Sequence, residues 1–246
     1  MPIYEKPVRL LMRDMVNELG VAKGQILAKE QVLSWFSKRY PKIKEGTISA
    51  HLIRRSTNAS SRVHYSAKPG EDDLFFQLDG GHFRLYDPAT DPPPVLTVTK
   101  PSGGAEAIEI PEPEGTAEFA YERDLQNFLV KNLSLLEPGL RLYEEEGITG
   151  IEFPAGGRFI DILAVDAQHN YVVIELKVSR GYDRVVGQLL RYMAWVKQHQ
   201  AEATQQVRGI IVAREISEDL LLACSSVPHV ELFEYELSVS LRRVAH

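Results

Sequence analysis

The chain has 246 residues and a formal net charge of −6, which predicts two compact domains. Its single cysteine, Cys224, excludes an intramolecular disulfide, and the sequence holds neither a CxxC nor an HExxH motif, which argues against a zinc site. It has no charged-then-apolar leader and no apolar stretch near 18 residues, so we expect a cytoplasmic, nucleoid-associated protein without membrane association.

The first 68 residues are basic although the whole chain is acidic. They hold 13 Lys and Arg against 5 Asp and Glu, a balance of +8, so the remainder carries −14. Such a basic module is the electrostatic footprint of a protein that binds a polyanion. We therefore expect double-stranded DNA as a partner.

The N-terminal pattern is typical of a winged-helix-like domain over residues 1–87. Amphipathic periodicity predicts helices at 7–19, 29–40 and 46–58. Two apolar runs, 74–78 and 82–86, flank Asp79-Gly80-Gly81 and predict a hairpin wing.

The third predicted helix and the residues behind it supply the candidate DNA contacts. Ile48 and Leu52 should face inward, which leaves a polar face. Arg and Asn side chains read guanine and adenine edges in the major groove, although a solvated basic helix could instead contact phosphates alone. The candidate DNA-binding residues are Ser49, His51, Arg54, Arg55, Asn58 and Arg62.

Proline-rich and glycine-rich segments between 88 and 116 predict a linker, and the second domain should span 117–246. A helix over 117–133 opens this domain. Two apolar strands follow at 158–166 and 171–177, with Asp161 on the first and Glu175 and Lys177 on one face of the second. Asp161 joins that face only if the loop holds three or five residues, because a slip of one residue would turn it to the other side.

Ionisable groups in an apolar strand pair need a compensating charge. Asp161 and Glu175 offer hard oxygen ligands that suit Mg²⁺, with Mn²⁺ as a substitute. A Lys177 ammonium beside the metal could orient the attacking water and neutralise charge in the transition state of phosphodiester hydrolysis. A structural Asp–Lys pair at a strand end is the alternative.

The rest of the domain completes an α/β sandwich. We expect a helix at 180–199, with Gln188 and Tyr192 on one flank, a strand at 207–213, a helix at 215–225 and one or two strands within 230–241. The strand–helix–strand order predicts a parallel pair, with helices on both faces of the sheet.

This ordered set of motifs resembles the PD-(D/E)xK, or restriction-endonuclease-like, nuclease superfamily. Within it, residues 118–241 are similar to the catalytic domain of NucS/EndoMS-type endonucleases, which carries a similar Asp-containing strand, a Val-Val-x-Glu-x-Lys strand and a Gln-Leu-x-Arg-Tyr helix. The run 128–140 also looks like the first helix of that family. The resemblance implies an α/β fold (α+β for the whole chain) whose C-terminal mixed sheet is flanked by helices.

The resemblance also implies a role for each matching residue. Asp161 and Glu175 would bind the metal, and Lys177 would assist the attacking water. Gln188 would orient that lysine or the scissile phosphate, and Tyr192 would support the site or face DNA. Glu122 would be the accessory acid of the first helix, with Glu118 one turn earlier as its alternative.

These features predict a Mg²⁺-dependent DNA endonuclease. The helical N-terminal domain differs from the β-rich dimerisation domain of the mismatch endonucleases, which favours a restriction-like enzyme, including one that depends on a modified base. A homodimer is expected because cutting both strands needs two sites related by a two-fold axis. The alternatives are a mismatch- or junction-directed repair nuclease and a catalytically inactive DNA-binding regulator.

Overall fold

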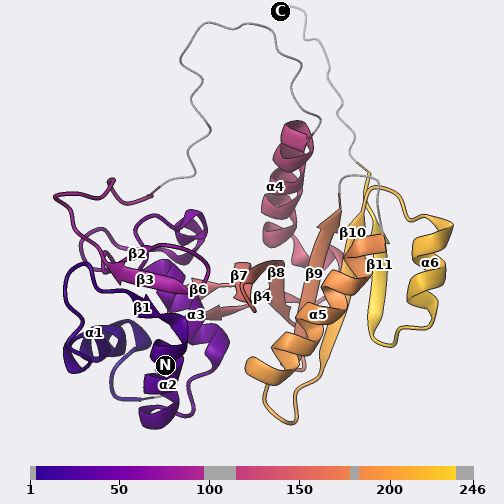
Figure 1. Ribbon diagram of the computed structural model, residues 1–246. Helices are drawn as coiled ribbons and strands as arrows, with labels where there is room; N and C mark the ends of the chain where they lie inside the picture. The colour runs from indigo at the N-terminus through magenta and orange to yellow at the C-terminus, as the bar shows by residue number, and fades with distance from the viewer. Residues whose placement is uncertain (1–3, 97–114, 178–182, 237–246) are drawn as a thin grey trace, which may run out of the picture.

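A computed structural model describes residues 4–96, 115–177 and 183–236. At 115–121 and 183 it describes the backbone only. Figure 1 shows the N-terminal half, in indigo and purple, beside a C-terminal sheet with its helices. No helix in these described ranges is long and apolar enough to cross a bilayer.

The N-terminal half consists of three helices and a small sheet. All three predicted helices and the predicted hairpin are present, but α3 ends at Arg54, four residues before the predicted end. The antiparallel sheet has the order β1-β3-β2. The elements are α1 (Val8–Glu18), β1 (Leu27–Ala28), α2 (Lys29–Arg39), α3 (Glu45–Arg54), the 3₁₀ helix η1 (Ser60–Tyr65), β2 (Phe75–Gln77) and β3 (His82–Leu85).

The C-terminal half begins with α4 (Gly115–Lys131) and ends, within the described residues, at β11 (Val230–Glu234). The helix therefore stops at Lys131, and most of the run 128–140 is not helical. Between these ends lie η2 (Leu133–Leu135), β4 (Arg141–Leu142), β5 (Glu144–Glu145), β6 (Ile148–Thr149), β7 (Ile151–Ala155), β8 (Arg158–Val165), β9 (Tyr171–Lys177), α5 (Asp183–His199), β10 (Val207–Ala213) and α6 (Glu218–Ser225).

The main sheet is mixed and is covered on both faces. The strand order is β11-β10-β9-β8-β4, and β7 pairs with another part of β8. Strands β9, β10 and β11 run parallel to one another, whereas β8 is antiparallel to β9, β4 and β7. Apolar residues of α5, such as Leu189, pack with Val173 on one face. Residues of α4, such as Leu125, pack with Ile174 on the other. The structure thus confirms the predicted α/β sandwich and the parallel pairing of β9 with β10.

The loop between β8 and β9 has the predicted odd length. Val165 pairs with Tyr171 and Ile162 with Ile174, so five residues, 166–170, form the connection. Asp166 closes this loop, because its Oδ1 accepts hydrogen bonds from the backbone N–H groups of Gln168 (2.9 Å) and Asn170 (2.8 Å). Continued by one residue, the register places Asp161 opposite Glu175.

Helix α3 is shared by the hydrophobic cores of both halves. Ile48 and Leu52 pack with the helices of the N-terminal half. Ala50 and Ile53 belong to the core that includes Phe153 of β7 and the buried residues of α5. Every residue from Gly46 to Arg54 is therefore buried, and α3 has no solvent-exposed face in that stretch.

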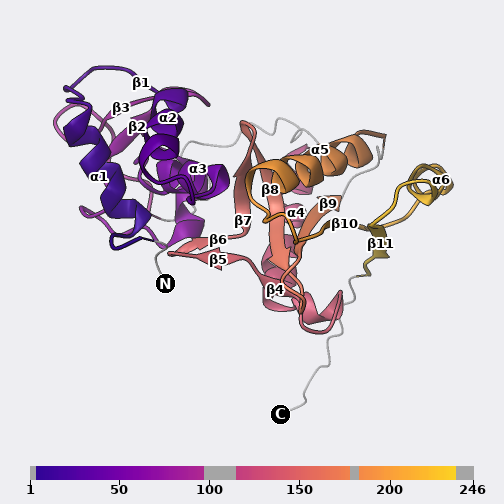
Figure 2. The same ribbon diagram turned by 90° about the horizontal axis from the view of Figure 1, so that it is seen from below.

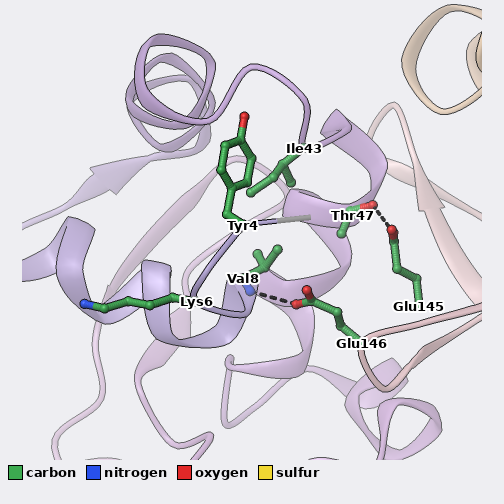
Figure 3. Close-up of a pocket in the computed structure, with 7 residues that line it drawn as sticks. All are labelled: Tyr4, Lys6, Val8, Ile43, Thr47, Glu145 and Glu146. Carbon is green, nitrogen blue, oxygen red and sulfur yellow. Dashed lines mark hydrogen bonds between the residues drawn. The ribbon is translucent and has the colours of Figure 1, made fainter. Parts of the chain in front are cut away.

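A hairpin of the C-terminal half, formed by β5 and β6, reaches the N-terminal half (Figure 2). At its turn, Glu146 Oε2 accepts a 2.7 Å hydrogen bond from the backbone N–H of Val8 at the start of α1. Thr47 donates a 2.7 Å bond to Glu145 Oε2 (Figure 3). An acid at the N-terminus of a helix also interacts favourably with the helix dipole, so this contact stabilises the docking of the two halves.

The described part of the predicted linker is attached to the N-terminal half. Arg84 forms an ion pair with Asp91, and the backbone N–H of Val95 donates a 2.8 Å hydrogen bond to the carbonyl of Thr57. Residues 97–114 lie outside the described ranges.

Gly46 tests the packing of α3 against β7 and the residue that follows α5, and Gly187 of α5 is its control. A Cβ at Gly46 would lie 2.3 Å from Gln200 Oε1 and 3.1 Å from the Phe153 ring, whereas no atom of the described residues lies within 4 Å of a Cβ at Gly187. We expect Gly46→Ala to lower the free energy of unfolding by about 1–3 kcal/mol, because the clash outweighs the gain in helix propensity. Gly187→Ala should raise it by up to about 1 kcal/mol.

Chemical denaturation of both variants measures these changes. Equal stabilisation by the two alanines would contradict the close approach of α3 to α5.

Candidate active site

Asp161 and Glu175 lie side by side where β8 begins to separate from β9. The Oδ2 of Asp161 accepts a 2.8 Å hydrogen bond from the backbone N–H of Leu176. Glu175 has no exposed surface; its Oε2 accepts a 2.6 Å bond from Gln188 Nε2, and its Oε1 has no hydrogen-bond partner among the described residues. An orphaned oxygen on a buried carboxyl group is unusual, because such groups are normally paired.

The surroundings of both acids disfavour ionisation. Burial raises the pKa of Asp161 to about 7, and the charges of Glu122 and Glu152 act in the same direction. Burial raises the pKa of Glu175 to about 9, with a further contribution from Asp161. Nearby like charges and desolvation both penalise the ionised form, so a bound cation would relieve the two acids together.

Lys177 and Glu122 lie close enough to affect both acids. Lys177 follows Glu175 by two residues on β9 and is half-buried, and its charge lowers the pKa of Asp161 and of Glu175. Glu122 on α4 raises both pKa values. The side chain of Glu118, its alternative, lies outside the described residues.

Helix α5 brings Gln188 and Tyr192 to the same place. Gln188 donates a hydrogen bond directly to the Glu175 carboxylate, so it orients this acid rather than Lys177. Tyr192 is buried, and burial together with the charge of Glu175 raises the pKa of its hydroxyl. Because these residues are four apart on one helix, both reach the sheet from the same flank.

The donor set fits Mg²⁺ through two carboxylates. Within the described ranges, no group of three or more His, Cys, Asp and Glu side chains is arranged to hold a metal ion. Mg²⁺ does not require one, because it commonly takes one or two carboxylates and completes its octahedron with water and phosphate oxygens. The free Oε1 of Glu175, next to Asp161, is the observation that supports a cation here.

Two neighbours of the site were absent from the sequence-based prediction. Gln126 of α4 donates a 2.8 Å hydrogen bond to the carbonyl oxygen of Asp161 and a 3.3 Å bond to Glu152 Oε1. Gln126 follows Glu122 by four residues on the same helix face, which is a signal that could have found it. Glu152 precedes β8 by several residues and carries no comparable local signal.

The structure corrects the prediction that the arginines of α3 and its flank read DNA. Arg54, Arg55 and Arg62 are buried. Arg54 bonds Asp72 Oδ2 at 3.1 and 3.2 Å and the carbonyl of Glu146 at 2.9 Å; Arg62 pairs with Asp73. Arg55 donates to the carbonyls of Arg9 and Glu71. Their guanidinium groups are bound by acceptors inside the protein and are not presented at its surface.

The other predicted contacts are also placed differently. Ser49 and His51 are buried, and burial with the charges of Arg54 and Arg55 lowers the pKa of His51 to about 3. Asn58 is exposed and bonds the backbone of Gln77 at the start of the hairpin. Residues 69–96 hold six acids and one base, so the charge surplus of residues 1–68 is largely offset within the same half.

Two families match the two parts of the chain. Residues 7–85 match a domain of unknown function, DUF7669, and residues 121–224 match the endonuclease NucS C-terminal domain. The second match contains Asp161, Glu175 and Lys177. It confirms the resemblance of the C-terminal half to NucS-type nucleases.

Individual relatives agree with this match. Endonuclease NucS of Methanopyrus kandleri is 33% identical over 100 residues, which cover 41% of this chain and 35% of the relative. Endonuclease NucS 2 of Halobacterium salinarum is 33% identical over 122 residues, 49% of this chain and 45% of the relative. The chain thus spans less than half the length of either relative.

Solved structures give partial likenesses. A repair endonuclease from Pyrococcus abyssi is 27% identical with a TM-score of 0.39, covering 54% of this chain and 50% of that one. A complex of EndoMS with double-stranded DNA is 25% identical with a TM-score of 0.40, covering 55% and 51%.

The raised pKa values predict how the metal-free protein responds to pH. Folded Asp161 and Glu175 keep protons that the unfolded chain has already released, so the unfolded state binds fewer protons and stability falls as pH rises. In EDTA, the Tm of the wild type should fall between about pH 5.5 and about pH 8.5 more steeply than the Tm of an Asp161→Asn, Glu175→Gln double variant.

Asp124→Asn, which alters an exposed acid on α4, is the matched control and should keep the wild-type slope. Identical slopes in the double variant and the wild type would show that the two acids are ionised in the folded protein.

Proposed function

We propose that this protein is a Mg²⁺-dependent endonuclease that hydrolyses phosphodiester bonds in double-stranded DNA. The observation that carries the proposal is the placement of Asp161 beside the buried, partly unpaired Glu175, with Lys177 on the same strand. The match of residues 121–224 to the NucS C-terminal domain supports it.

In this mechanism, Asp161 and Glu175 hold the metal, which supplies Lewis-acid chemistry at the phosphoryl group. Gln188 fixes the orientation of the Glu175 carboxylate through its 2.6 Å hydrogen bond. Lys177 orients the attacking water and offsets negative charge that develops in the transition state. Glu122 is the accessory acid, and Tyr192, buried close enough for the charge of Glu175 to raise its pKa, supports the site.

The relatives favour a repair nuclease over a restriction-like enzyme. Both named relatives are NucS endonucleases, and they match the half that contains the site. We therefore place the mismatch- or junction-directed alternative ahead of the restriction-like hypothesis. An inactive DNA-binding regulator is the least supported alternative, because Asp161, Glu175 and Lys177 are all present and adjacent.

The N-terminal half is proposed to contact the same DNA. Its three helices and exposed hairpin support a winged-helix-like description, but α3 is excluded as the reading element because both its faces are covered. The exposed candidates are Asn58 and the hairpin turn around Asp79. A homodimer, which would place two sites on opposite strands, is part of this proposal.

Substitution of Lys177 tests the catalytic assignment. Lys177→Ala should lower the rate of duplex cleavage in Mg²⁺ by about 100- to 10,000-fold, because the attacking water loses its cationic partner. Lys197→Ala, at the far end of α5, should cleave at the wild-type rate. DNA binding measured in EDTA should be the same for both variants, and unchanged cleavage by Lys177→Ala would refute the assignment.

A substrate panel tests the repair hypothesis. We expect Mg²⁺-dependent cleavage of mismatched or branched duplexes at a higher kcat/KM than of fully paired, 5-methylcytosine or hydroxymethylated duplexes. The measurement is initial cleavage rate on end-labelled DNA. Cleavage confined to a modified, fully paired duplex would support the restriction-like alternative instead.

A further inference from the structure

Three acidic residues form one row across neighbouring strands. Ile151 pairs with Ile162 and Phe153 with Ile160, so Glu152 of β7 lies opposite Asp161 of β8. The β8–β9 register places Glu175 opposite Asp161 on its other side. Asp161 is therefore flanked by a glutamate on each neighbouring strand.

Glu152 has a backbone conformation that its surroundings must maintain. Its φ is +49°, in the left-handed region that non-glycine residues rarely adopt. Such a conformation costs on the order of 1 kcal/mol or more and persists only where neighbouring contacts hold it. Two of these contacts involve Gln126 and Tyr65.

Gln126 connects Glu152 to the backbone of Asp161. Its Nε2 donates to the Asp161 carbonyl at 2.8 Å and to Glu152 Oε1 at 3.3 Å, and the side chain is only 5% exposed. The pairing of β8 with β9 ends next to Asp161, at Ile162 and Ile174. The Gln126 amide therefore supplies the Asp161 carbonyl with a hydrogen bond beyond the end of that pairing. Its loss would remove this hydrogen-bond donor from the Asp161 carbonyl.

Tyr65 holds Glu152 from the other half of the protein. Tyr65 ends the 3₁₀ helix η1 and has no exposed surface, and its hydroxyl donates a 2.5 Å hydrogen bond to the Glu152 carbonyl. Burial raises the pKa of this hydroxyl well above its usual value, so it stays protonated and remains a donor. The hydrogen bond joins the N-terminal half to the row of acids.

We propose that Tyr65, Glu152 and Gln126 are positioning residues through which the N-terminal half holds Asp161 in its metal-binding place. The inference rests on the proposed function, because it takes Asp161 as a metal ligand. Metal ligands must be held to within fractions of an ångström, and the groups that orient them commonly change metal affinity by about 10- to 100-fold when removed. The N-terminal half is then part of the catalytic centre as well as a DNA-binding module.

A matched pair of hydroxyl deletions separates positioning from interface stability. Tyr65→Phe removes only the donor to the Glu152 carbonyl. Thr149→Val removes a comparable hydroxyl, which donates a 3.0 Å bond to the His64 carbonyl across the same boundary but away from Asp161. Thermal denaturation should show similar small losses of stability in both variants.

Calorimetric titration of the full chain with MnCl₂ alone, without DNA, is the decisive measurement. We expect Tyr65→Phe and Gln126→Leu to weaken Mn²⁺ binding by about 10- to 100-fold, and Thr149→Val to bind as the wild type does. With the best duplex of the panel, kcat should fall in the first two variants while KM for DNA is unchanged. If Gln126→Leu does not fold, the Mn²⁺ affinity of Tyr65→Phe tests the inference by itself, because this variant keeps the aromatic ring in the core.

The outcomes distinguish the two proposals. If Tyr65→Phe and Thr149→Val weakened Mn²⁺ binding equally, the Tyr65 hydrogen bond would serve only to stabilise the interface between the halves. That result would overturn the inference. A wild type that cleaves DNA while Tyr65→Phe and Gln126→Leu keep full Mn²⁺ affinity would also overturn it and leave the proposed function standing. A wild type that binds Mn²⁺ and cleaves no duplex would end the proposed function, and the same titration would still decide the inference. A wild type that binds no Mn²⁺ would overturn the inference.

Discussion

The burial of Glu175 beside Asp161 is the constraint on which the rest of the C-terminal half depends. Two carboxyl groups in an apolar sheet repel each other when ionised and lose hydration in either state. The protein compensates for only part of this, through the Leu176 backbone N–H, the Gln188 amide and the charge of Lys177. Within the part of the chain that the structure describes, one oxygen of Glu175 has no hydrogen-bond partner. A cation at this point would stabilise the folded state and would also be placed for hydrolysis, so stability and chemistry rest on the same pair.

Helix α5 explains how this site is joined to the N-terminal half. Near its start, Gln188 contacts Glu175; at its end, His199 lies 2.7 Å from Glu45 of α3, and the next residue, Gln200, fills the space above Gly46. Helix α5 therefore has one contact at the site and another at the N-terminal half. The Tyr65–Glu152 contact provides a second connection on the other side of β8.

The N-terminal half shows why a local pattern can mislead. Arg54 and Arg55 have the spacing and chemistry of a DNA-reading helix, and their neighbours in sequence do not oppose that interpretation. The acidic loop that pairs with them, around Asp72, lies almost 20 residues later, and the carbonyl of Glu146 comes from the other half. Burial of these two guanidinium groups is tolerated because Arg54 has a carboxylate and two carbonyl oxygens as acceptors, and Arg55 has two carbonyl oxygens. Asn58 alone of the predicted contacts is exposed.

The sequence by itself determined the three N-terminal helices and the hairpin, the main helices and strands from β8 to β11, the odd length of the loop after β8, and the placement of Asp161, Glu175 and Lys177 on a strand pair. These features follow from local periodicity and from the alternation of side chains along a strand, which act over a few residues. Only the tertiary structure decided that both faces of α3 are covered and that Gln126, Glu152 and Tyr65 meet at Asp161. Such contacts join residues tens of positions apart and depend on how whole elements pack. The spacing of Gln126 from Glu122 marks Gln126 itself, but no short-range pattern in the chain identifies its partners.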